Sequence, residues 1–210
     1  MLSALQQAVT RPASFFEREA RDPGLLRPAV VVGLLAVVGL LAAVPTFLAI
    51  AEALPAGAGI FAAVGFAIGS VIGAVVPFVT WLLFAVLFFL GTVVFGGDGE
   101  FRDLFAATGW GFAPRVVATV VGAVVSFVVI SGTDFSDPQQ AQQVSQTVAT
   151  GTLGLLNQGV SALTYLWSGW VWTHAVASTR ELSVRQAGAV VGVVVVLALA
   201  LNVGSALLFA

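Results

Sequence analysis

The sequence of 210 residues contains no cysteine and no lysine, it contains a single histidine, and only 9% of its residues are charged. Without cysteine the chain forms no disulfide, no thiol nucleophile and no thiolate metal site. The low charge excludes an ordinary soluble domain, in which about a quarter of the residues are charged. A net charge of −2, without a basic cluster, argues against a nucleic-acid partner.

Long stretches without formal charge hold most of the hydrophobic residues, which make up 59% of the chain. A helix of about 20 apolar residues crosses the roughly 30 Å hydrocarbon core of a bilayer. The pattern predicts an all-α integral membrane bundle of five transmembrane helices, at about 28–50, 66–95, 110–131, 153–177 and 186–209. Residues 1–27 are expected to form a cytoplasmic amphipathic segment and residues 28–210 the transmembrane domain, with the lipid bilayer as a partner.

The positions of the arginines predict the orientation of the bundle. All eight flank the predicted spans on one side of the membrane: Arg11, Arg18, Arg21, Arg27, Arg102, Arg115, Arg180 and Arg185. Because arginine is concentrated in cytoplasmic loops, the N-terminus is expected in the cytoplasm and the C-terminus outside. The uncharged stretch 53–97 is long enough for two crossings, but two would leave four arginines on each side, so one is predicted. The expected location is the cell membrane, as a multi-pass protein.

Short local patterns predict helix starts. Ser14 with Glu17, and Ser183 with Gln186, have the three-residue spacing of a capping box. In the predicted outer connection, the Asp137-Pro138 pair also favours a helix start. We expect the first capping box in a short helix on the membrane surface and the second at the beginning of the last span.

Glycines line one face of the second predicted span. Gly65, Gly69 and Gly73 recur every four residues, and Pro77 follows at the same spacing. Glycines let another helix approach closely, and proline kinks a helix. This is a candidate helix-packing face, either for static packing or as a hinge. The spacing serves packing within the chain and dimerisation equally well, so a homo-oligomer is one alternative.

The connection before the third span carries the densest charge in the chain, with Asp98, Glu100, Arg102 and Asp103 close together. It is interpreted as a solvated loop, as a docking loop for a protein partner, or as a divalent-cation site, since such cations need several oxygen ligands. The spacing does not resemble a calcium-binding loop and Arg102 supplies a competing cation. No metal site is therefore predicted.

Polar residues recur on one helical face of the fourth predicted span. They are Asn157, Ser161, Tyr165, Ser168 and Trp172. Because lipid offers no hydrogen-bond partner, this polar stripe is expected to face the bundle or a wet cavity. It is either a substrate path or head-group pocket, or a set of hydrogen bonds between helices.

His174 lies beside tryptophans at the inner end of the same span. A metal site or proton relay needs partners, and no acid lies within any predicted span. An interfacial histidine is the favoured interpretation. The chain contains no motif of a catalytic nucleophile and no intramembrane metal motif, so no enzyme activity and no cofactor are predicted.

The stretch Phe101-Arg102-Asp103-Leu104-Phe105, followed by Gly109-Trp110-Gly111-Phe112-Ala113-Pro114, resembles the entry to the third span in the Yip family. These are five-span membrane proteins whose eukaryotic members interact with Rab-type GTPases. In the family, tyrosine is commoner at the position of Trp110. The opening Arg11-Pro12-Ala13-Ser14-Phe15-Phe16 resembles the start of prokaryotic Yip-domain proteins.

The resemblance implies a non-enzymatic membrane organiser or adaptor that binds a protein partner at the cytoplasmic face. The candidate contact residues are Asp98, Glu100, Arg102, Asp103, Trp110, Pro114 and Arg115. Trp110 and Arg115 are also expected to anchor the third span at the interface, Arg115 by extending its head toward water. The alternative function is a transporter or channel for a small solute or lipid, using the polar face of the fourth span.

Overall fold

The computed structural model describes residues 2–19, 24–55, 57–131, 133, 140, 144 and 151–208, with side chains as far as residue 201. Within these residues the chain forms eight α-helices and no strand. The helices are α1 (Leu2–Thr10), α2 (Pro12–Glu19), α3 (Leu26–Ala53), α4 (Gly59–Val93), α5 (Phe101–Trp110), α6 (Ala113–Ser131), α8 (Thr152–Thr179) and α9 (Val184–Leu208). Arg21 and the Asp137-Pro138 pair lie outside the described residues.

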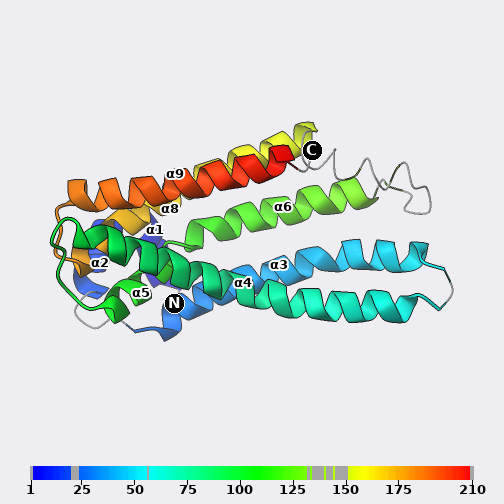
Figure 1. Ribbon diagram of the computed structural model, residues 1–210, viewed down its shortest axis with the longest axis horizontal. Helices are drawn as coiled ribbons and strands as arrows, with labels where there is room; N and C mark the ends of the chain where they lie inside the picture. The colour runs from blue at the N-terminus through cyan, green and yellow to red at the C-terminus, as the bar shows by residue number, and fades with distance from the viewer. Residues whose placement is uncertain are drawn as a thin grey trace.

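Five long helices, α3, α4, α6, α8 and α9, extend along the long axis of the molecule (Figure 1). Four of them, α3, α4, α6 and α9, are long and apolar enough to cross a membrane. Leu41, Ile68 and Leu197 are more than half exposed on these helices, as expected of surfaces that face lipid. α8 has 28 residues, about 42 Å of helix, but it is more polar than the other four.

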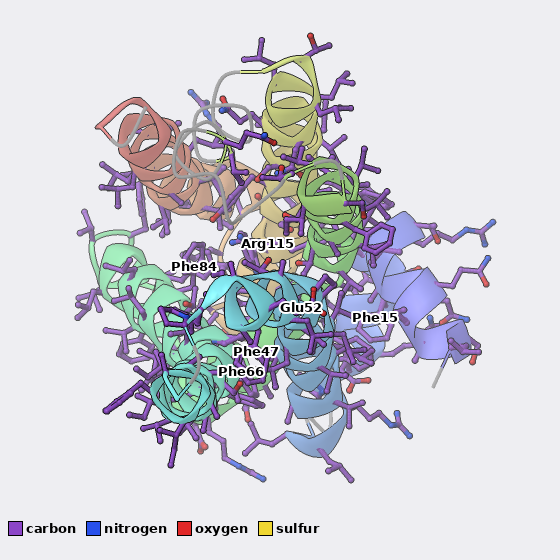
Figure 2. All side chains as sticks on the ribbon, turned by 90° about the vertical axis from the view of Figure 1, so that its right-hand side faces the viewer. Phe15, Phe47, Glu52, Phe66, Phe84 and Arg115 are labelled. Carbon is purple, nitrogen blue, oxygen red and sulfur yellow. The ribbon has the colours of Figure 1, made fainter. Side chains whose placement is uncertain are left out.

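The long helices surround a common interior. They contact one another in the order α4, α3, α6, α8 and α9, and α9 returns to α4. An added Cβ on Gly91 of α4 would come within 2.6 Å of Val190 on α9, so the absence of a side chain allows this close approach. Figure 2 is viewed along the bundle and shows the helices arranged as a ring.

The short helices α1, α2 and α5 gather at one end of the bundle, together with the turn between α8 and α9 (Figure 1). The seven described arginines lie on or beside these short helices, at the start of a long helix, or in that turn. We call this the arginine end, and we call the opposite end, which contains Glu52 and the α3–α4 turn, the far end. Six of the seven described arginines lie at this end of the bundle, and Arg115, in the first turn of α6, lies deeper.

An aromatic core fills the arginine end. The Trp172 ring on α8 lies 4.9 Å from the Phe84 ring, 5.6 Å from Phe88 and 5.2 Å from Phe112, measured between centroids. All four side chains are buried. Trp172 Nε1 donates a hydrogen bond to the Thr108 carbonyl at 2.8 Å, so the polar end of the indole is satisfied inside the core.

The N-terminal segment forms two helices, whereas one short helix was expected. Both α1 and α2 pack on α8. There Trp167 Nε1 donates a hydrogen bond to the Val9 carbonyl at 2.9 Å. The Phe15 ring meets the Trp110 ring edge-on at 5.0 Å. The two helices therefore cover the aromatic core at the arginine end.

One predicted capping box is confirmed and the other is wrong. The backbone N–H of Gln186 donates to Ser183 Oγ at 3.3 Å, and the backbone N–H of Ser183 donates to Gln186 Oε1 at 3.1 Å, so this pair caps α9. Ser14 lies inside α2 and donates to the Arg11 carbonyl at 3.2 Å. This helix begins earlier, at Pro12, because the fixed φ of proline suits the first helical position.

The entry to the third span is divided into two helices. α5 ends at Trp110, and α6 begins at Ala113, whereas the sequence predicts one continuous entry from about residue 110. An added Cβ on Gly111 would overlap the Trp172 indole. The chain turns at this glycine because only a residue without a side chain fits against the indole.

Candidate functional site

The connection between α4 and α5 is a glycine-rich turn at the arginine end (residues 94–100, the charged turn). Gly96 and Gly99 have φ angles of +70° and +105°, in the left-handed region that favours glycine. The Gly97 amide donates to the Thr92 carbonyl at 3.0 Å, which closes the end of α4. An added Cβ on Gly99 would overlap the Thr179 carbonyl, so the charged turn lies directly against the end of α8.

Arg180 holds the charged turn in place. Its side chain is only 3% exposed, and Nε donates to Thr92 Oγ1 at 3.0 Å. Its two terminal nitrogens donate to the carbonyls of Gly97 and Gly99. The guanidinium carbon lies 4.3 Å from the centre of the Phe89 ring. Nothing in the sequence around Arg180 signals a buried cation, so this role is not predictable from it.

The seven predicted contact residues do not form one surface. Three of them are exposed: Asp98, Glu100 and Arg102. Asp103 is half-buried in the first turn of α5. Trp110 and Pro114 are buried, so they present no surface to a partner, and the predicted interfacial anchor at Trp110 is wrong. Arg115 belongs to a different part of the molecule, described below.

In the part of the chain that the structure describes, no three His, Cys, Asp or Glu side chains form a group able to hold a metal ion. His174 is half-buried on α8, and its ring meets the Trp170 ring edge-on at 5.9 Å. The Trp170 indole supplies no metal ligand, so this neighbour does not build a metal site.

The polar stripe of α8 faces the interior of the ring of helices. Ser168 and Trp172 are fully buried, and Tyr165 is 7% exposed. Ser168 Oγ has no hydrogen-bond partner among the described residues. Asn157 and Ser161, nearer the far end, line a cavity. The stripe therefore includes both core packing and the wall of a hollow.

This hollow, the Arg115 cavity, lies between α3, α6 and α8 and has a volume of about 300 Å³. Its walls are formed by Ala42, Arg115, Ala118, Thr119, Gly122, Ala123, Ser126, Asn157 and Ser161. The guanidinium carbon of Arg115 lies 3.9 Å from the centre of the Tyr165 ring, a cation–π contact. Arg115 lies near the middle of the ring when the bundle is viewed along its axis (Figure 2). The head of Arg115 thus rests on Tyr165, whereas the sequence predicts that it extends toward water at the interface.

A second hollow of about 180 Å³ adjoins Arg115 on the side of α3 and α4. It shares Arg115 and Thr119 with the Arg115 cavity, and Pro77 forms part of its wall. Arg115 thus has open space on two sides.

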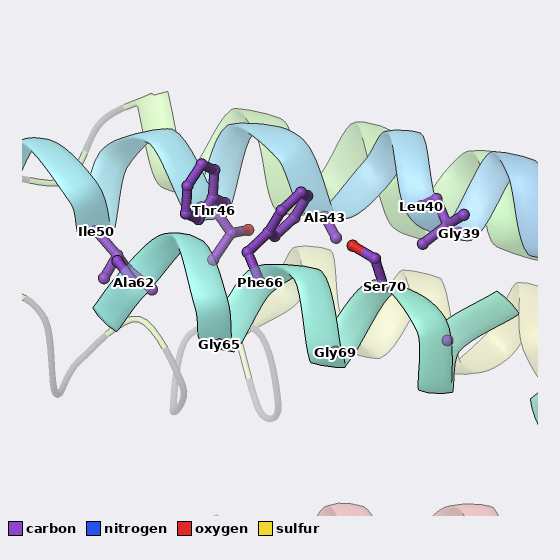
Figure 3. A pocket seen from close by; sticks show the side chains of 12 residues that line it. Gly39, Leu40, Ala43, Thr46, Ile50, Ala62, Gly65, Phe66, Gly69 and Ser70 are labelled. Carbon is purple, nitrogen blue, oxygen red and sulfur yellow. The ribbon is translucent and has the colours of Figure 1, made fainter. Parts of the chain in front are cut away.

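The predicted glycine face of α4 lines an open groove against α3, with a volume of about 590 Å³ (Figure 3). An added Cβ on Gly65 or Gly69 would meet no neighbouring atom within 4 Å, and one on Gly73 would make only ordinary contact with α3. The Phe47 and Phe66 rings stack across the groove at 4.3 Å. Close packing at Gly65 and Gly69 is therefore absent within the described chain.

A comparison with known families gives a match to the Yip1 domain over residues 7–206. The chain belongs to the Yip1 domain family. The match extends from α1 to α9 and confirms the family resemblance seen at the entry to the third span. Together with the four apolar helices, it makes this Yip1 domain a multi-pass membrane protein. No curated protein and no solved structure matches the chain.

Proposed function

We propose that this Yip1 domain protein is a non-enzymatic membrane organiser or adaptor of prokaryotic type. In this proposal it resides in the cell membrane and binds a protein partner at its cytoplasmic face. α8 is then the fifth transmembrane helix, since it lies between α6 and α9 and is long enough to cross. Five crossings put the arginine end in the cytoplasm and the C-terminus outside, the orientation favoured by the distribution of arginine.

The observation that carries the proposal is the charged turn itself, which is held by buried Arg180 while its own charges are exposed. A surface that is already ordered loses little conformational entropy on binding. Asp98, Glu100 and Arg102 present both signs of charge within a short segment. Such a pattern favours a partner with complementary charges and disfavours others.

The test is a charge reversal at the exposed positions, Glu100→Lys combined with Arg102→Glu. The tagged protein is purified from its native membrane in a gentle detergent, and co-purifying proteins are identified by mass spectrometry. Arg185→Glu is the matched control, because Arg185 is also an exposed arginine at the arginine end. We expect a stoichiometric partner that the double variant loses and the control keeps. Equal recovery of the partner with both variants would contradict this contact.

A second candidate function is a transporter or channel for a small solute or lipid. The Arg115 cavity favours it, because the cavity combines polar side chains of the α8 stripe with a cation inside the ring. Asn157→Ala and Tyr165→Phe are expected to change flux in liposomes while the protein still folds. Flux that is indistinguishable from that of empty liposomes would exclude this candidate.

A further inference from the structure

We infer that the Arg115 cavity is a binding site for an oxyanion of the phosphate type, with the Arg115 guanidinium as its principal ligand. The inference is independent of the proposed partner contact, which lies on the charged turn and the first turn of α5 at the arginine end.

The first argument is the depth of Arg115. Its guanidinium rests on Tyr165, which lies 14 residues before the end of α8 (165 to 179), or about 21 Å along the helix. Ala42 lines the same cavity, and Glu52 lies ten residues further along α3, or about 15 Å away. A charged side chain at such depth faces the protein interior and marks a site where a ligand or counter-charge is held.

The second argument is the contrast between the two interior arginines. Arg180 directs its N–H groups at Thr92, Gly97 and Gly99, so its hydrogen bonds are satisfied by the protein. Among the described residues, none accepts a hydrogen bond from the Arg115 guanidinium; its observed contact is the face of Tyr165. An aromatic face attracts the cation but uses none of its N–H donors in the plane. Those donors form a fork that matches the oxygens of a phosphate group.

The third argument is the chemistry and size of the walls. Asn157 and Ser161 bring an amide and a hydroxyl to the same cavity, whereas the Thr119 hydroxyl donates to the Arg115 carbonyl at 3.0 Å. An added Cβ on Gly122 would lie 3.3 Å from Asn157 Oδ1, so glycine at this position leaves the room that Asn157 occupies. A volume of about 300 Å³ lies at the lower end of the range for small-ligand sites and far exceeds the space for one water.

The oxyanion has two sources, a free ion or the head group of a phospholipid, and the experiment separates them. The full-length protein is purified in detergent and stripped of lipid. One arm adds inorganic phosphate and follows binding by calorimetry and ³¹P NMR. The other arm adds phosphatidylglycerol and counts bound lipids by native mass spectrometry, with diacylglycerol, which lacks the phosphate, as the reference lipid.

The variants are Arg115→Gln in the cavity and Arg185→Gln as the matched control at the exposed surface. We expect at least one arm to show binding, with affinity at least about tenfold weaker in Arg115→Gln and unchanged in Arg185→Gln. Binding of phosphate alone identifies a free ion, and binding of phosphatidylglycerol without diacylglycerol identifies a head group.

The inference is overturned if the wild-type protein binds neither probe, or if Arg115→Gln binds as tightly as the wild type. Ser161→Val provides a second variant that keeps the arginine but removes one hydroxyl from the wall, so the inference stays testable if Arg115→Gln does not fold. It is expected to weaken binding of the same probe, and unchanged affinity would count against the cavity.

Discussion

Replacing Arg180 by alanine tests whether the charged turn is held as the structure indicates. The substitution removes three hydrogen bonds from a charged donor, to Thr92, Gly97 and Gly99. Each such bond contributes about 1.5–3 kcal/mol, but removal of the cation also removes the cost of burying it. We therefore expect the free energy of unfolding to fall by about 3–5 kcal/mol.

Two further variants separate the hydrogen bonds from the fit of the turn. Arg180→Lys keeps the charge but lacks the planar fork, so it cannot reach all three acceptors and is expected to be intermediate. Gly99→Ala keeps Arg180 but places a Cβ against the Thr179 carbonyl at a φ of +105°. Backbone strain of this kind costs about 1–3 kcal/mol before any overlap is counted. Gly159→Ala is the control, since its Cβ would meet nothing within 4 Å.

The assay is unfolding in mixed micelles with increasing sodium dodecyl sulfate, followed by the fluorescence of the five tryptophans. Hydrogen exchange of residues 94–100 reports the order of the turn directly. The reasoning is refuted if Arg180→Ala loses less than about 0.5 kcal/mol, the range of an ordinary surface substitution, and the turn keeps its protection.

The remaining predictions use simpler changes. Because the chain has no cysteine, Glu52→Cys and Glu181→Cys each introduce a single labelling site. Five crossings predict that an impermeant maleimide reaches the two cysteines from opposite sides of the membrane. Labelling of both cysteines from the same side would exclude α8 as a span. Gly69→Ala is expected to leave the free energy of unfolding in the same assay unchanged or to raise it. Gly109→Ala, whose Cβ would lie 2.6 Å from Pro28, should lower it by about 1–3 kcal/mol. Ser183→Ala should cost about 1 kcal/mol by removing the cap of α9, and an unchanged midpoint would contradict that role.

Features that depend on local pattern could be predicted from the sequence. Apolar stretches identify α3, α4, α6 and α9 because length and hydropathy alone decide whether a helix can cross a membrane. The cap at Ser183 follows from a spacing of three residues. The cap predicted at Ser14 has the same kind of spacing, but Pro12 starts the helix earlier, so one local signal overrides another.

The depth of a side chain could not be predicted, because it depends on how separate helices are stacked. Both Arg115 and Arg180 flank apolar stretches and read as interfacial arginines in the sequence. Arg180 is covered because the charged turn folds over the end of α8. Arg115 faces an internal cavity because α6 begins inside the bundle, after the turn at Gly111 that packs on Trp172, so its first turn is not level with the end of α8.

The packing of α5 and of the turn after it explains how an arginine comes to lie inside the ring of helices. Gly109 leaves room for Pro28 and Trp81, and Gly111 leaves room for the Trp172 indole, so α5 and the turn after it fit against the aromatic core. With this turn buried, α6 starts within the bundle and its first turn carries Arg115 onto Tyr165. Gly109 and Gly111, two of the residues by which the family resemblance was first seen, are therefore packing residues, and their consequence is the position of a cation beside an open, polar cavity.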